Sequence, residues 1–221
     1  MSEIAVRARR SDAPRRKTAS NGARAQKSAA RREAILAAAL DEFSAQGFAA
    51  ARLDDVARRA GVAKGTIYVH FRDKEALFQE LIRSVLSPVV GSLETALRRD
   101  VPVRAIVGEV VELFVKEVYG TRRKDVIRLI ISEGPRFPKL AEFYYREVLA
   151  RVIQAMRGLL RHALERGEID NEAIVRFPQL LVAPGLVAII WSGLFDRFEP
   201  LDVHALMRAQ LDLLFGKGRA R

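Results

Sequence analysis

Hydrophobic residues recur every three or four positions along most of this chain, a spacing that places them on one face of an α-helix. Such stripes lie within residues 35–43, 53–60, 77–85, 107–118, 138–166 and 203–214. Gly47 and Gly61 follow the first two stripes as expected C-terminal stops. Asp73 precedes the third stripe as an expected N-cap, and Pro88 should kink the helix that follows it. No alternating stretch beside a hairpin turn occurs, so the chain is predicted to be all-α.

One apolar segment needs its own interpretation, because residues 177–195 carry no charge. Pro178 and Pro184 interrupt its first half, which leaves only residues 185–195 as an unbroken helix. At 1.5 Å per residue, such a helix is too short to cross the roughly 30 Å of a bilayer core. We therefore favour burial against a second copy of the chain over a membrane span.

The net charge of +11 over 221 residues is concentrated at the N-terminus. Residues 1–32 hold ten basic and two acidic residues. Apolar periodicity is absent up to about residue 27, so we expect segment 1–27 to be a disordered basic arm when free. It could be a solubilising tail or, less readily, a mitochondrial transit peptide, but we favour an arm that tracks a polyanion. Its candidate contact residues are Arg24, Lys27, Arg31 and Arg32.

The rest of the composition argues against several classes of site. The chain has no cysteine, which removes thiolate metal sites, disulfides and cysteine nucleophiles. Its three histidines are far apart, so neither a metal site nor a cofactor is expected. No nucleophile–base pair, carboxylate pair or glycine-rich phosphate loop is recognisable, and we do not expect an enzyme.

The stretch 51–78 reads ARLDDVARRAGVAKGTIYVHFRDKEALF and predicts a helix-turn-helix. A short amphipathic helix over 53–60 meets a tight turn, where Gly61 permits the sharp reversal, and a second short helix follows. Val62, Ile67 and Phe71 should pack inward on the first helix. The remaining face of the second helix offers a cation, hydroxyls, an aromatic ring, a methyl surface and bare backbone to DNA, from Lys64, Gly65, Thr66, Tyr68, Val69 and His70.

The run KGTIYVHFRDKEALF at residues 64–78 resembles the DNA-binding signature of tetracycline-repressor-type (TetR/AcrR) regulators. The resemblance extends to the layout, and implies about nine helices. A three-helix DNA-binding domain would span residues 28–75, and a helical effector-binding and dimerisation domain would span 76–221. Residues 133–138 and the long helix after them resemble one C-terminal subtype of the family.

The resemblance also implies roles for single residues. Gly65 would let the recognition helix approach DNA closely, and Lys74 would bind a backbone phosphate. This chain departs from the family in having Ala51 and Arg52 where a threonine often opens the motif, and Ala63 where a serine often precedes the Lys-Gly pair. Arg52 is expected to substitute for the first hydroxyl. The residues expected in the major groove or on its flanking phosphates are Lys64, Thr66, Tyr68, Val69 and His70.

The motif needs additional positive charge, since residues 33–75 hold six basic and seven acidic residues. We therefore expect the basic arm to lie along phosphates or in the minor groove.

The resemblance further implies a homodimer in which helices near 184–195 and 203–215 form a four-helix bundle with the partner chain. An effector bound between the helices would change the spacing of two recognition helices that read half-sites of a palindromic operator about 34–36 Å apart in double-stranded DNA. The expected function is a cytoplasmic, nucleoid-associated repressor released by an unknown small molecule. Polar candidates for the effector pocket are Arg128, Glu133, Arg136, Tyr144, His162 and Trp191.

Two other functions remain open at this point. An activator of the same fold would differ only in where its operator lies. A nonspecific DNA or RNA binder driven by the arm would lack the roughly 10³-fold preference for an operator over random DNA that a regulator needs.

Overall fold

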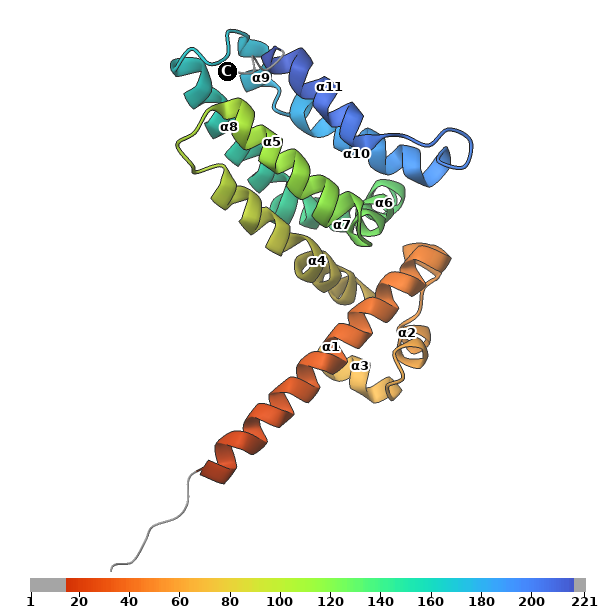
Figure 1. Cartoon of the computed structure of the whole chain (residues 1–221). Helices are drawn as coiled ribbons and strands as arrows, with labels where there is room; N and C mark the ends of the chain where they lie inside the picture. The colour runs from red at the N-terminus through yellow and green to blue at the C-terminus, as the bar shows by residue number, and fades with distance from the viewer. Residues whose placement is uncertain (1–14, 217–221) are drawn as a thin grey trace, which may run out of the picture.

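The computed structural model describes residues 15–216, with side chains from residue 26 onward. This part of the chain contains helices and no strands, which confirms the all-α prediction (Figure 1). Two π turns continue longer helices, one at the end of a helix and one within a helix, so the described residues form ten continuous helices, close to the nine expected. The segments are α1 Arg15–Ala50, α2 Leu53–Arg59, α3 Lys64–His70, α4 Lys74–Ala96, α5 Val103–Leu113, η1 Phe114–Tyr119, α6 Arg123–Glu133, α7 Pro138–Tyr144, η2 Tyr145–Leu149, α8 Ala150–Glu165, α9 Glu172–Arg176, α10 Gln179–Leu194 and α11 Val203–Phe215.

Helix α1 begins earlier than predicted. Residues 15–27, expected to be disordered, are helical and project past α2 and α3 (Figure 1). Eight of its 13 residues are Ala, Arg or Lys, which favour a helix without needing an apolar face, and the segment is continuous with the packed part of α1. Residues 1–14 of the predicted arm lie outside the described residues. At the other end, Gly47 bends the chain with φ 74°, which agrees with its expected role as a stop.

An aromatic cluster joins the helices of the predicted DNA-binding domain to the rest of the molecule. The ring of Phe43 lies 5.5 Å from that of Phe48 and 5.2 Å from that of Phe78, between centroids. Phe137, just before α7, packs edge-on against Phe48 at 4.7 Å. These four rings come from α1, α4 and the loop before α7, so they fix the bent end of α1 against the C-terminal helices.

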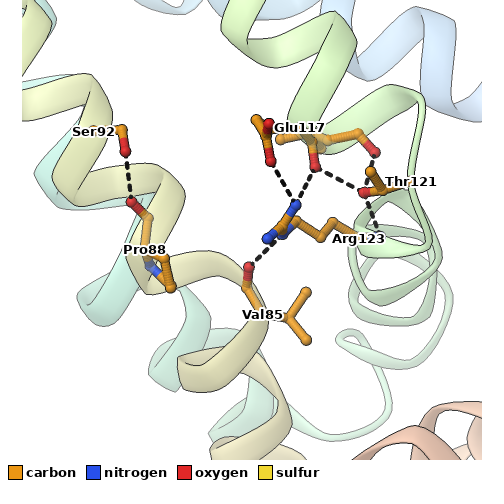
Figure 2. Close-up of polar contacts among 7 residues, drawn as sticks. Val85, Pro88, Ser92, Glu117, Thr121 and Arg123 are labelled. Atoms are coloured by element: carbon orange, nitrogen blue, oxygen red, sulfur yellow. Dashed lines mark hydrogen bonds and ion pairs between the residues drawn. The ribbon is translucent and has the colours of Figure 1, made fainter.

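Helix α4 leads from the predicted helix-turn-helix into the C-terminal domain and runs through Pro88, which was expected to kink it. A proline inside a helix cannot donate to the carbonyl four residues earlier, and its ring displaces nearby carbonyls. Beside it, Arg123 at the start of α6 donates from Nε to the Val85 carbonyl at 2.9 Å. The same guanidinium donates to the carbonyl and carboxylate of Glu117, at the end of η1, at 2.9 and 3.0 Å (Figure 2). Arg123 therefore ties together α4, η1 and α6.

Helix α10 differs from the prediction, since it runs unbroken through Pro184 over 16 residues. Pro184 leaves the Leu180 carbonyl without its helical donor. The side-chain amide of Gln210 on α11 donates to that carbonyl and so replaces the missing bond. Helices α10 and α11 lie side by side at the edge of the molecule (Figure 1). Within residues 15–216, no helix has both the length and the apolar character to span a membrane.

Candidate DNA-binding site and ligand cavity

Helices α2 and α3 form the predicted helix-turn-helix. Gly61 adopts a left-handed φ of 66° in the turn, and the Val62 amide donates to the Ala57 carbonyl at 3.0 Å. Ile67 and Phe71 are buried as expected, in one core with Val56. The side chain of Asp73 accepts a hydrogen bond from the Ala76 amide at 2.7 Å, which confirms it as the N-cap of α4.

The outer face of α3 is exposed, and part of it is apolar. Val69 is 82% exposed and Tyr68 is 48% exposed, although both sit beside Ile67, which the same helix buries completely. Lys64, Gly65 and His70 are exposed beside them, and Thr66 is half-buried. The predicted contact residues of α3 are therefore exposed, apart from the half-buried Thr66. An apolar and aromatic surface of this kind can contact thymine methyl groups and base edges.

Lys64 is held in place by an ion pair within the motif. Its Nζ donates to Asp54 Oδ2 on α2 at 2.7 Å, and this hydrogen bond together with the Asp54 charge raises the pKa of Lys64. The other carboxylate oxygen of Asp54 is buried and has no partner. Asp54 is therefore the counter-ion of Lys64 in this structure.

At both positions where the sequence departs from the family pattern, the helix lacks a side-chain N-cap. Arg52 and Ala63 stand at the N-caps of α2 and α3, and neither makes a side-chain capping bond. The Arg52 side chain is exposed, where it is free to contact phosphate.

Lys74 stands in the first turn of α4, as expected, and makes contacts that the sequence did not predict. Its Nζ donates to the carbonyls of Phe48, Ala49 and Ala51 at 2.8, 2.6 and 3.4 Å, and lies 5.0 Å from the centre of the Phe48 ring. All three ammonium protons have acceptors at the bent end of α1. Lys74 is a cap for α1 in this structure, and a phosphate contact would have to replace or share these bonds.

The arm residues fall into three groups. Lys27 and Arg31 are exposed on α1. Arg32 forms an ion pair with Glu80 of α4, so it ties α1 to α4. Arg24 lies in the helix, but its side chain falls outside the description.

An apolar cavity of about 150 Å³, partly open to solvent, lies in the C-terminal domain. Its walls come from α4, α5, η1, α6, α7, η2, α8, α10 and α11, and of its 21 lining residues only Tyr144 carries a polar side chain. Burial raises the pKa of Tyr144 to about 12. Periodicity could not have identified this lining, because a residue beside a cavity and a residue in a solid core occupy the same helical stripe.

The other polar residues predicted for the pocket do not line this cavity. Arg128 donates to the Ile189 carbonyl and the Ser192 hydroxyl, and so ties α6 to α10. The remaining four are dispersed. Glu133 lies against Gly47, and Arg136 is exposed near the Phe137 ring. His162 lines a separate polar hollow with Arg98 and Glu168, and Trp191 donates to the Glu199 carbonyl. Within the described chain, no group of three or more histidine, aspartate or glutamate side chains is arranged to hold a metal ion.

Comparison with known proteins agrees with this arrangement. Residues 35–81 match the family described as "Bacterial regulatory proteins, tetR family", and residues 91–212 match "Tetracyclin repressor-like, C-terminal domain". The HTH-type transcriptional regulator SrpR of Pseudomonas putida is 32% identical over 78% of this chain and 79% of its own. The HTH-type transcriptional repressor BepR of Brucella suis is 33% identical over 64% of this chain and 69% of its own.

A solved structure shows the same fold. The transcriptional regulator FadR from Bacillus subtilis, in complex with stearoyl-CoA, superposes with a TM-score of 0.68 at 21% identity and covers 84% of this chain and 99% of its own. Both domains and a relative that matches over more than three quarters of each chain thus point the same way as the helix-turn-helix. The chain belongs to the TetR family and is a DNA-binding transcriptional regulator.

Proposed function

We propose that this regulator is a repressor that binds a palindromic operator as a homodimer and leaves it when a small molecule binds. The exposed face of α3 carries the DNA-reading part of the proposal. Packing within the chain leaves Val69 and Tyr68 exposed. Thymine methyl groups and base edges would bury both side chains. On binding, phosphate would compete with Asp54 for Lys64.

The basic arm supplies affinity that the motif lacks. Lys27 and Arg31 are exposed on a helix that extends beyond α3, and further arginines precede them in the sequence. Each phosphate contact contributes about 0.9 to the slope of log K against log salt. Deleting residues 1–27 should therefore weaken binding and flatten this slope, and an unchanged slope would contradict the role of the arm.

The dimer rests on an unpartnered apolar face of α10 and α11. Val187, Ile190 and Leu194 are 49%, 40% and 59% exposed and lie along one side of α10. Leu213 on the neighbouring α11 is 84% exposed. A second copy of the same pair of helices would cover this face and form the four-helix bundle. A charge at its centre, Ile190→Asp, should convert the dimer to a monomer in multi-angle light scattering, while Arg146→Ala on the exposed surface should not.

Release by an effector is supported by the internal cavity. BepR is named as a repressor, and the FadR structure of the same fold holds stearoyl-CoA. In this chain the cavity touches α4, which leads to the DNA-binding helices, and α10, which carries the proposed dimer face. A molecule bound there would bear on both elements that set the spacing of the recognition helices.

Fluorescence anisotropy on DNA from immediately upstream of the gene, against a scrambled duplex near physiological salt, tests the proposal. We expect sequence-dependent binding that Lys64→Ala and Tyr68→Ala abolish and Arg146→Ala leaves unchanged. Equal binding to both duplexes, followed by a random-sequence selection that enriches no preferred site, would favour a nonspecific, arm-driven binder. A reporter placed behind the operator separates repressor from activator, because loss of the regulator should raise its expression.

A further inference from the structure

The walls of the apolar cavity carry no charge. Twenty of its 21 lining residues have aliphatic, aromatic or thioether side chains, or none in the case of Gly185. A charged ligand group placed there would lose its hydration without gaining a counter-charge or a set of hydrogen bonds, which is strongly unfavourable. The cavity therefore selects against anions and cations.

The size of the cavity limits the ligand further. Its volume of about 150 Å³ is that of an engineered apolar protein cavity, lined by similar side chains, that takes up benzene. A Cβ on Gly185 would stand 3.0 Å from the Phe114 ring, so α10 and η1 are already in contact at this wall. A molecule of about one aromatic ring matches this volume.

Tyr144 provides one polar group in this apolar lining. Burial alone accounts for its raised pKa, with no contribution from a hydrogen bond or a neighbouring charge. Its hydroxyl therefore stays protonated near neutral pH and can donate one hydrogen bond and accept another.

Both π turns of the described chain border the same cavity. Phe114 and Val118 belong to η1, and Val148 and Leu149 belong to η2, whose N-cap is Tyr144 itself. π turns are rare and occur frequently at functional sites. Their meeting at one cavity is an observation independent of its volume and polarity.

From these observations we infer that the cavity binds an uncharged, largely apolar molecule of about one aromatic ring, oriented by a single hydrogen bond to the hydroxyl of Tyr144. This inference rests on the proposed function, because it names the chemical class of the effector. Phenol, toluene and benzoate are suitable probes, since they are close in size and differ in hydrogen bonding and charge.

Isothermal titration calorimetry on the full chain tests the inference. We expect phenol and toluene to bind with one site per chain and benzoate to show no saturable binding. Tyr144→Phe should weaken phenol about five-fold, the value of one ordinary hydrogen bond, and leave toluene unchanged. Tyr145→Phe, which changes the exposed neighbouring tyrosine, should bind all three probes as the unaltered chain does. Val152→Phe, which fills the cavity, should abolish binding of phenol and toluene.

Three results would overturn the inference: no saturable binding of phenol or toluene up to their solubility limits, benzoate binding as tightly as phenol, or an unchanged preference for phenol over toluene in Tyr144→Phe. The anisotropy assay keeps this inference separate from the proposed function. Phenol that binds without lowering operator affinity would refute effector release and leave the chemistry of the cavity standing. Release from the operator by an anion, in a chain that binds no phenol, would refute the proposed chemistry of the cavity and leave effector release standing.

Discussion

Replacing Lys74 with methionine separates a structural role from a phosphate contact. The ammonium donates to three carbonyls, and the two short bonds, to Phe48 and Ala49 at 2.8 and 2.6 Å, should dominate. A hydrogen bond to a charged group contributes about 1.5–3 kcal/mol, and the Ala49 carbonyl is exposed enough to recover water. Methionine keeps the length of the stem over Phe48 but donates nothing. We expect a loss of about 2–3 kcal/mol in the free energy of unfolding.

Urea unfolding and thermal melting measure this loss without DNA. For a chain of this size, it corresponds to a fall in Tm of roughly 4–12 °C. Lys64→Met is the matched control, because Lys64 is an exposed lysine of the same domain and its loss should change stability by less than about 1 kcal/mol. An unchanged Tm in Lys74→Met, together with a salt slope of DNA binding reduced by about 0.9, would refute the capping role and restore the phosphate contact.

Three further predictions concern packing, backbone satisfaction and titration. Ile67→Ala should cost about 2–5 kcal/mol in urea unfolding, because Ile67 is fully buried, whereas Val69→Ala on the exposed face should weaken operator binding at unchanged stability. Gln210→Leu should cost about 1–3 kcal/mol in the same assay, and far less in a Pro184→Ala background, where the helix supplies the missing donor; equal costs in both backgrounds would contradict this account. Tyr144 keeps its proton in the folded chain after the unfolded chain has lost it near pH 10, so stability should fall between about pH 10 and its folded pKa of about 12, with a slope that Tyr144→Phe reduces.

The helix-turn-helix could be predicted because its signals are local. Gly61 turns the chain, Asp73 caps the helix that follows, and Ile67 and Phe71 alternate with exposed positions at helical spacing. Each signal acts within a few residues of the element that it determines. The pattern therefore carries the information without any tertiary context.

The features that escaped prediction depend on partners distant in the sequence, or belong to a helix that has no apolar face. Helix α10 survives Pro184 because an amide on another helix supplies a donor. Lys74 caps α1 across more than twenty positions, which no local pattern encodes. The basic part of α1 has no apolar face, so its lack of periodicity does not distinguish an exposed helix from a disordered segment.

Each π turn is equivalent to one extra residue accommodated within a helix, and this bears on how the chain tolerates length changes. Deleting one residue from η1 would return it to regular α geometry, so the length change would be absorbed at the turn itself. The widened turn that carries Phe114 and Val118 to the cavity wall would then be lost. In evolution, gain or loss of a single residue at this turn is thus a route by which a relative could acquire or abandon ligand sensing while its DNA-binding helices stay the same.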